Sequence, residues 1–152
     1  MDPPKMLLES TFLRAIADPA DDHHERAVGV YLLLLQQYED HRILLVAISD
    51  HLRRFRCWRH VGPLAPVDEL YVGFQHRRAA RRALQLAAND DLDRALTLVM
   101  CERHGVSRVA TFDPFFAAYD LELTPSAPAA LDNGEEISVA ETSINGRVVD
   151  AS

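Results

Sequence analysis

The feature that most constrains the fold is an unbroken apolar run from Ile43 to Ile48. Its side chains are aliphatic and largely branched, and no polar residue interrupts them. Such a run is typical of a strand that is buried on both of its faces, as the strands of a parallel sheet are. Parallel strands need crossover segments between them, and these are usually helices. The run therefore predicts an α/β fold with helices on both sides of a sheet.

A shorter apolar run from Met6 to Leu8 and a β-prone run from Val106 to Phe112 predict further strands. Apolar residues at helical spacing indicate helices between them. The predicted helices cover residues 12–16, 23–40, 51–55, 67–74, 75–88 and 92–104. This order of elements predicts a three-layer α/β sandwich with a mostly parallel central sheet.

The chain of 152 residues is most simply one domain followed by a tail. We place the domain at residues 1–123. From Thr124 onward the composition changes to Pro, Gly and acidic residues, so residues 124–152 are predicted to be a weakly structured tail or to form a small hairpin from 137–139 and 147–149.

The net charge of −7 argues against a surface that is basic throughout. A local basic surface is still possible, because four arginines at i, i+1, i+4 and i+5 spacing share one face of a predicted helix: Arg77, Arg78, Arg81 and Arg82. One interpretation is a track for RNA phosphates. The other is a solvated face that balances the acidic chain, and the sequence leaves both open.

No apolar run reaches the length of a membrane span, and the N-terminus lacks the features of a signal peptide. Cys57 and Cys101 have no metal-type spacing, so two ordinary thiols in a reducing compartment are expected. We therefore predict a cytoplasmic protein. No histidine has a second His or Cys at ligand spacing, so solvent or capping roles are expected for all seven, including His51.

Four acids lie where the predicted sheet would gather them. Glu9 and Asp113 follow two strands at their carboxyl ends, Asp50 comes just after the third, and Asp93 begins a helix. In parallel sheets the ligand site lies beyond the carboxyl ends of the strands. Like charges held together repel unless a cation lies between them. Mg²⁺ or Mn²⁺ suits such a site, and phosphodiester hydrolysis is its natural chemistry.

Each acid also has an ordinary structural explanation. Asp93 lies at a helix start, where acids stabilise the helix dipole. Asp113 precedes Pro114, so it could serve only the turn. Glu9 and Asp50 could be solvated strand ends. Spacing alone leaves the structural and the metal-binding interpretations open.

Two segments carry a resemblance to a known family. Asp93-Arg94-Ala95-Leu96, followed after the next strand by Ala110-Thr111-Phe112-Asp113, resembles the C-terminal signature of the PIN-domain ribonucleases. Leu8-Glu9-Ser10-Thr11-Phe12-Leu13 is similar to the first-strand motif of that family. The resemblance covers about residues 6–123, and many members with this layout are toxins of VapC type that are paired with a small antitoxin.

The resemblance implies a PIN-like fold and a Mg²⁺- or Mn²⁺-dependent endoribonuclease acting on RNA. It assigns Glu9, Asp93 and Asp113 to the cation, directly or through water, while Asp50 completes the site or orients the attacking water. Ser10 or Thr111 would steady a carboxylate or a phosphate by hydrogen bonding. Members commonly form homodimers, and the apolar helices between His23 and Phe74 are the expected interface.

Three departures from the family pattern bear on activity. Glu9 stands where the family has Asp, Asp50 stands where it has Glu, and Phe116 stands where many members have a further acid. Metal geometry depends on the length of each ligand arm. The alternative is therefore a catalytically impaired PIN-like module that binds RNA or protein. A third possibility is an unrelated phosphate-binding α/β protein whose acids lie apart.

Overall fold

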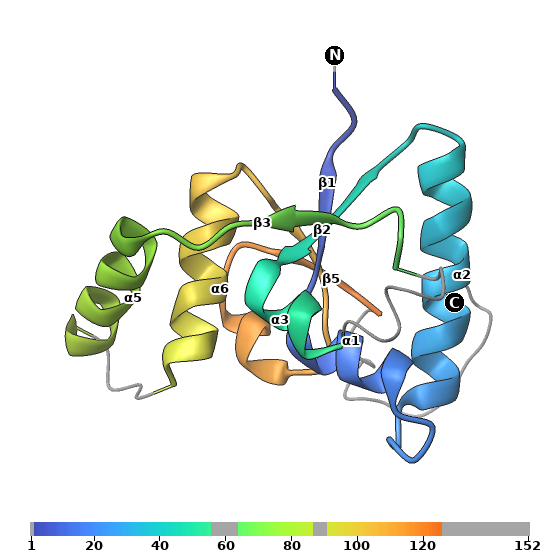
Figure 1. Ribbon diagram of the computed structural model, residues 1–152, viewed down its shortest axis with the longest axis horizontal. Coiled ribbons are helices and arrows are strands. Elements are labelled where there is room, and N and C mark those ends of the chain that lie inside the picture. Colours follow the sequence, from blue (N-terminus) through green and yellow to red (C-terminus); the bar gives the residue numbers. More distant parts are fainter. Residues whose placement is uncertain (1, 56–63, 87–90, 126–152) are drawn as a thin grey trace.

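The structure is a computed structural model that describes residues 2–55, 64–86 and 91–125 (Figure 1). The hairpin predicted within the tail lies outside these residues. The helical elements are α1 (Ser10–Ala17), α2 (His24–Glu39), α3 (Ser49–Arg54), α5 (Phe74–Leu86), α6 (Leu92–Arg103) and the 3₁₀ helix η1 (Pro114–Ala118). The strands are β1 (Lys5–Leu8), β2 (Leu44–Ile48), β3 (Asp68–Leu70), β4 (Arg108–Ala110) and β5 (Glu122–Thr124).

The strands form one five-stranded parallel sheet in the order β3-β2-β1-β4-β5. β1 is central, and its Leu7 lies opposite Val46 of β2 and Val109 of β4. The α/β class and the mostly parallel sheet expected from the sequence are confirmed.

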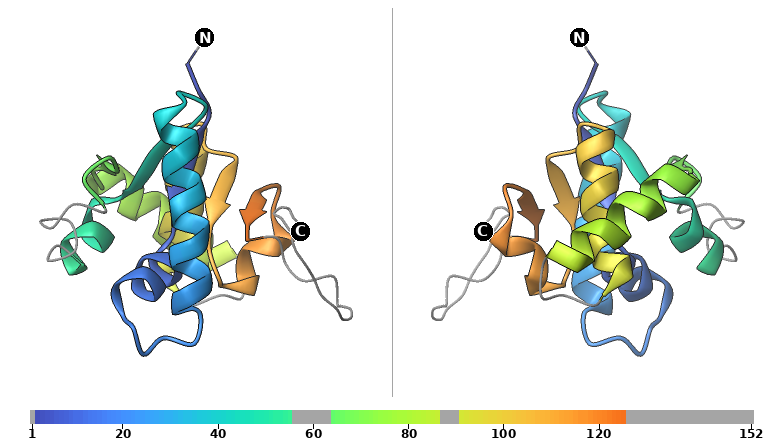
Figure 2. Two further views of the ribbon diagram at one scale, coloured as in Figure 1. Left: turned by 90° about the vertical axis from the view of Figure 1, so that its right-hand side faces the viewer. Right: turned by 90° about the vertical axis from the view of Figure 1, so that its left-hand side faces the viewer.

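The apolar strands fill both faces of the sheet because successive side chains of a strand point to opposite sides. Met6 and Leu8 pack into a core with α1 and α2, whereas Leu7 packs into a second core with α6. β2 divides its side chains between the same two cores. Figure 2 shows α2 in front of the sheet from one side, and α5 with α6 in front of it from the other. The layers are therefore helix, sheet and helix.

The chain reverses its direction of progress across the sheet beside β1. From β1 it moves to β2 and β3 on one side, and it then returns to β4 and β5 on the other side of β1. Such a topological switch point separates the connections that leave the carboxyl ends of the two adjacent strands, and ligands bind there. The segments that follow β1 and β4 both start at this point.

Two elements differ from the sequence prediction. The predicted helix over residues 67–74 is wrong, because Asp68–Leu70 forms β3 and pairs with β2. Asp68 and Glu69 resemble the acidic start of a helix. The segment forms a strand instead, because Leu70 is buried and the free edge of β2 is available for pairing. β5 was not predicted either, and it carries the sheet to Thr124, one residue past the predicted domain end at 123.

None of the helices within the described part of the chain is long and apolar enough to cross a membrane.

Candidate functional site

Glu9 is a buried carboxylate at the junction of β1 and α1. It is the N-cap of α1, and only 4% of its surface is exposed. Its Oε1 accepts hydrogen bonds from the Thr11 backbone N–H at 3.0 Å and from the Thr11 hydroxyl. Its Oε2 accepts one from the Ser10 hydroxyl at 2.9 Å. Burial of a charged group is costly unless such donors compensate it, so the sequence Glu-Ser-Thr supplies locally what the carboxylate needs.

Two threonines connect Glu9 to the loop after β4. The Thr111 hydroxyl donates to Glu9 Oε1 at 2.7 Å and accepts from the Asp113 backbone N–H at 2.9 Å. The Thr11 hydroxyl accepts from the Phe112 backbone N–H at 2.9 Å. These hydrogen bonds hold the segment after β1 and the segment after β4 in fixed positions relative to each other. Asp113 then caps η1 by accepting from the Phe115 N–H.

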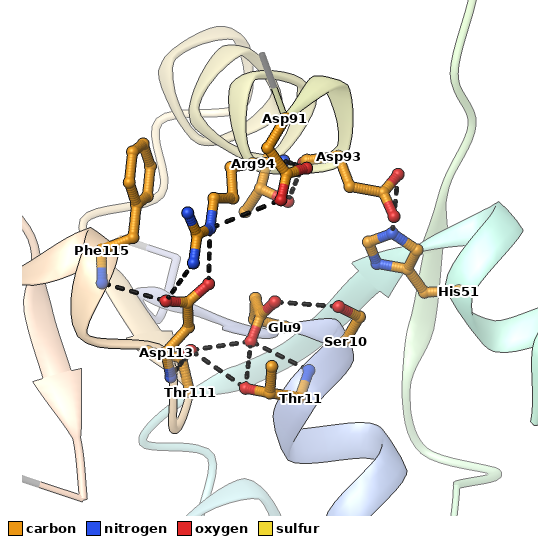
Figure 3. A network of polar contacts seen from close by, with 11 residues as sticks. Glu9, Ser10, Thr11, His51, Asp91, Asp93, Arg94, Thr111, Asp113 and Phe115 are labelled. Carbon is orange, nitrogen blue, oxygen red and sulfur yellow. Dashed lines mark hydrogen bonds and ion pairs between the residues drawn. The ribbon is translucent and has the colours of Figure 1, made fainter. Parts of the chain in front are cut away.

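Asp113 is paired with an arginine that the sequence analysis did not assign to the site. Arg94 donates from Nε and Nη2 to the two carboxylate oxygens of Asp113, at 2.9 Å and 3.1 Å. Its Nε also lies 3.5 Å from Asp91 Oδ2, and its guanidinium lies over the Phe115 ring. The hydrogen bond to Asp113 raises the pKa of Arg94. Arg94 therefore neutralises charge in this part of the acidic cluster (Figure 3).

Asp93 faces a buried histidine. Its side chain, 54% exposed, has Oδ1 at 3.8 Å from Nε2 of His51 and Oδ2 at 4.0 Å from Nη2 of Arg54. His51 is 2% exposed in its side chain, and neither of its ring nitrogens has a hydrogen-bond partner in the described part of the protein. Burial lowers the pKa of His51, an effect that Asp93 partly opposes. The predicted solvent or capping role of His51 is wrong.

Asp50 lies among arginines. Its carboxylate pairs with Arg53 and, at 2.9 Å, with Arg77. It makes no hydrogen bond with the network around Glu9 within the residues described. Successive side chains of a helix point about 100° apart, so α3 directs His51 inward and Asp50 toward α5.

The arginine face of α5 is divided between two environments. Arg77 is occupied by Asp50. The other three members, Arg78, Arg81 and Arg82, are exposed, and with Phe74 they line an open pocket of about 420 Å³. Phe74 itself is exposed, so the pocket combines positive charge with an aromatic ring.

The four predicted acids thus have different surroundings. Over residues 2–55, 64–86 and 91–125, no group of three or more His, Cys, Asp or Glu side chains has the arrangement of a metal site. Glu9 is enclosed by hydroxyls, Asp113 by Arg94 and Asp50 by Arg53 and Arg77. Mg²⁺ is often held by only one or two protein carboxylates, with water and phosphate as the other ligands. The exposed Asp93 beside the orphaned nitrogens of His51 is a donor set that fits a cation held in this way.

Sequence reasoning missed Arg94 and His51. Arg94 had a signal, since it is the basic residue that directly follows the acidic sequence Asp90-Asp91-Leu92-Asp93. His51 had none, because a helix of six residues is too short for its buried face to emerge from periodicity.

The element order and the five-stranded parallel sheet define the class as a PIN-like α/β fold. Comparison with solved structures supports this class. The fold is similar to that of VapC20 from Mycobacterium tuberculosis, a toxin that cleaves the sarcin–ricin loop, with a TM-score of 0.56 and 14% sequence identity over 74% of this chain and 93% of VapC20. No protein-family model matches the sequence, and a search of curated proteins found no match.

Proposed function

We propose that this protein is a metal-dependent endoribonuclease and the toxin of a toxin–antitoxin pair. One observation carries the proposal. Glu9, Asp93 and Asp113 come from three different elements, and all lie at the carboxyl edge of the sheet beside the switch point of a VapC-type PIN fold (Figure 3).

In this proposal, Glu9, Asp93 and Asp113 hold Mg²⁺ or Mn²⁺, directly or through water. A bound cation would supply the positive charge that activates water and stabilises charge developing on the scissile phosphate. The chain's own residues prepare the site for it. Ser10, Thr11 and Thr111 fix the orientation of Glu9. Arg94 occupies Asp113 in the free protein, and it would turn to a phosphate once the carboxylate is engaged.

We propose RNA as the substrate class, with the exposed arginines of α5 as phosphate contacts. Arg78, Arg81 and Arg82 can each bind a phosphate bidentately, and Phe74 offers a ring on which a base can stack. Arg77 belongs to this track only when it leaves Asp50.

The proposed partners are a small antitoxin and a second copy of this chain, in the cytoplasm. α2 supports the homodimer, because two of its leucines, Leu32 and Leu33, are 61% and 58% exposed. Adjacent exposed leucines on one helix are typical of an interface.

The test is cleavage of a structured RNA by metal-stripped protein, with and without added Mn²⁺. Asp93→Asn and Asp113→Asn are each expected to lower the rate at least about 100-fold, because each removes a charge that the cation needs. Glu102→Gln is the matched control, since Glu102 is an exposed acid of the same helix as Asp93. Equal loss in all three variants, or metal-independent cleavage, would refute the proposal.

A second function, an impaired module that binds RNA or protein without cleaving, is favoured by one contact. The fork of Arg94 engages both oxygens of Asp113, which a cation would need. If that contact is permanent, Mn²⁺ will not raise the melting midpoint of the wild-type protein, whereas Arg94→Gln will gain such a rise by mass action. A Mn²⁺-dependent rise in the wild type together with cleavage favours the enzyme instead.

A further inference from the structure

His51 is an unexplained buried group. Its imidazole is nearly inaccessible, and both ring nitrogens lack a hydrogen-bond partner within residues 2–55, 64–86 and 91–125. Leaving a buried polar atom unsatisfied destabilises the folded state, and such atoms are rare in native proteins. A leucine of similar size would fill the same space without this cost. Stability therefore gives no reason for a histidine at this position.

The position and direction of the ring point to the acidic edge. His51 lies two residues past the first residue of α3, which follows β2 directly, so it stands next to the strand that delivers Glu9. Figure 3 shows the ring and the Asp93 carboxylate directed toward each other, from α3 and α6. Their separation of 3.8 Å is too long for a hydrogen bond. Two ligands of one cation can be up to about 4 Å apart, twice the usual metal–ligand distance.

We propose that His51 is a ligand of the divalent cation, together with Asp93, and that it shifts the preference of the site from Mg²⁺ toward transition-metal ions. The inference rests on the proposed function, because it concerns the same cation. Mg²⁺ prefers oxygen ligands, whereas imidazole binds Co²⁺, Ni²⁺ and Zn²⁺ well. An acid at this position would keep the site oxygen-only. The histidine replaces an oxygen ligand with a nitrogen ligand, and this change lowers the affinity for Mg²⁺ relative to that for transition-metal ions.

The role falls to His51 because its neighbour Asp50 is occupied. Arg53 and Arg77 neutralise the Asp50 carboxylate on the outer side of α3. The inner side of the same helix directs the imidazole toward Asp93 Oδ1, while Arg54 at the end of the helix lies 4.0 Å from Asp93 Oδ2. The ligand expected from the segment after β2 is thereby displaced by one residue, from position 50 to position 51.

The experiment measures binding of Mg²⁺, Mn²⁺ and Co²⁺ to metal-stripped full-length protein by titration calorimetry, with the visible spectrum of Co²⁺ as a second readout. His51→Leu keeps the volume and removes the nitrogen, and His51→Glu restores an oxygen ligand. His104→Leu is the matched control. His104 also has a ring nitrogen, Nε2, without a hydrogen-bond partner among the residues that the structure describes. It lies at the C-cap of α6, near Lys5 at the amino end of β1.

The wild type should bind Co²⁺ more tightly than Mg²⁺. His51→Leu should lower the affinity for Co²⁺ at least about tenfold and change the visible spectrum of bound Co²⁺, whereas its affinity for Mg²⁺ should stay within about threefold of the wild-type value. His51→Glu should raise the affinity for Mg²⁺ relative to that for Co²⁺. His104→Leu should bind both ions as the wild type does. Circular dichroism of each variant confirms folding. If cations bind but the ratio of Co²⁺ to Mg²⁺ affinity is unchanged in a folded His51→Leu, the inference is overturned and the proposed function stands. If the wild type binds no cation, the proposed function fails with it.

Discussion

At the scale of single residues, the hydroxyl of Thr111 connects two parts of the site and also lies 3.3 Å from the Thr11 hydroxyl. It donates to Glu9 and accepts from the Asp113 N–H. The same atom therefore compensates a buried charge and sets the start of the loop that presents Asp113. A hydroxyl can do both because it has one donor and two acceptor sites.

Thr111→Val should consequently destabilise the fold more than its small change in shape suggests. We expect a loss of about 1–3 kcal/mol in the free energy of unfolding, because a buried carboxylate and a backbone N–H each lose a partner. Urea unfolding followed by circular dichroism measures it. Thr111→Ser keeps the hydroxyl and should lose less than half as much, and equal losses in the two variants would show that only packing matters.

At the scale of elements, α5 has one engaged arginine and three exposed ones. Arg77 pairs with Asp50 and thereby links α5 to α3, while Arg78, Arg81 and Arg82 border the pocket with Phe74. When exposed arginines bind phosphates, counterions are released from the nucleic acid. The salt dependence of the affinity therefore measures how many phosphate contacts form.

Replacing Arg78, Arg81 and Arg82 together by Gln should flatten the dependence of RNA affinity on salt. The slope of log affinity against log salt concentration should fall by about 2, since each contact to single-stranded RNA contributes about 0.7. Fluorescence anisotropy over a salt series measures the slope. Arg103→Gln, an exposed arginine on α6, should leave it within error. An unchanged slope in the triple variant would mean that this face is only solvated.

At the scale of the whole molecule, the helical layer that contains α2 carries two adjacent exposed leucines. α2 buries Ala27, Tyr31 and Leu34 against the sheet, yet Leu32 and Leu33 point to solvent. The inward residues explain why the helix docks, and they do not explain the two exposed leucines. A second copy of the chain would cover them.

The chain of 17.1 kDa should therefore run as a dimer in light scattering coupled to gel filtration. Replacing Leu32 and Leu33 together by Gln should yield the monomer without loss of secondary structure, because both side chains lie outside the core. Tyr119→Gln alters an exposed aromatic residue outside the expected interface and should leave the dimer intact. A wild type that is monomeric at tens of micromolar contradicts the expectation.

Part of the candidate site follows from local pattern. Glu9 comes directly after an apolar run and Asp113 after a β-prone run, and parallel pairing of these two strands brings both acids to one edge. Arg94, His51 and the pairing of Asp50 with Arg77 do not follow in this way, because each depends on how a helix is rotated and which helix lies beside it. An apolar run indicates that a segment is buried, but it does not indicate which residues of another element the segment contacts.

The sequence by itself determined the layers. The runs at Met6–Leu8 and Ile43–Ile48 have no polar face, so they require a sheet covered on both sides. Only the tertiary structure decided that Asp68–Leu70 and Glu122–Thr124 are strands, because three residues hold too little pattern and acquire their form from the strand they pair with. It also decided that His51 and Asp93 face each other, since α3 and α6 meet only when the sheet has placed them. The pattern of apolar residues along the chain indicates which segments are buried, whereas contact between side chains from distant segments depends on how the elements pack.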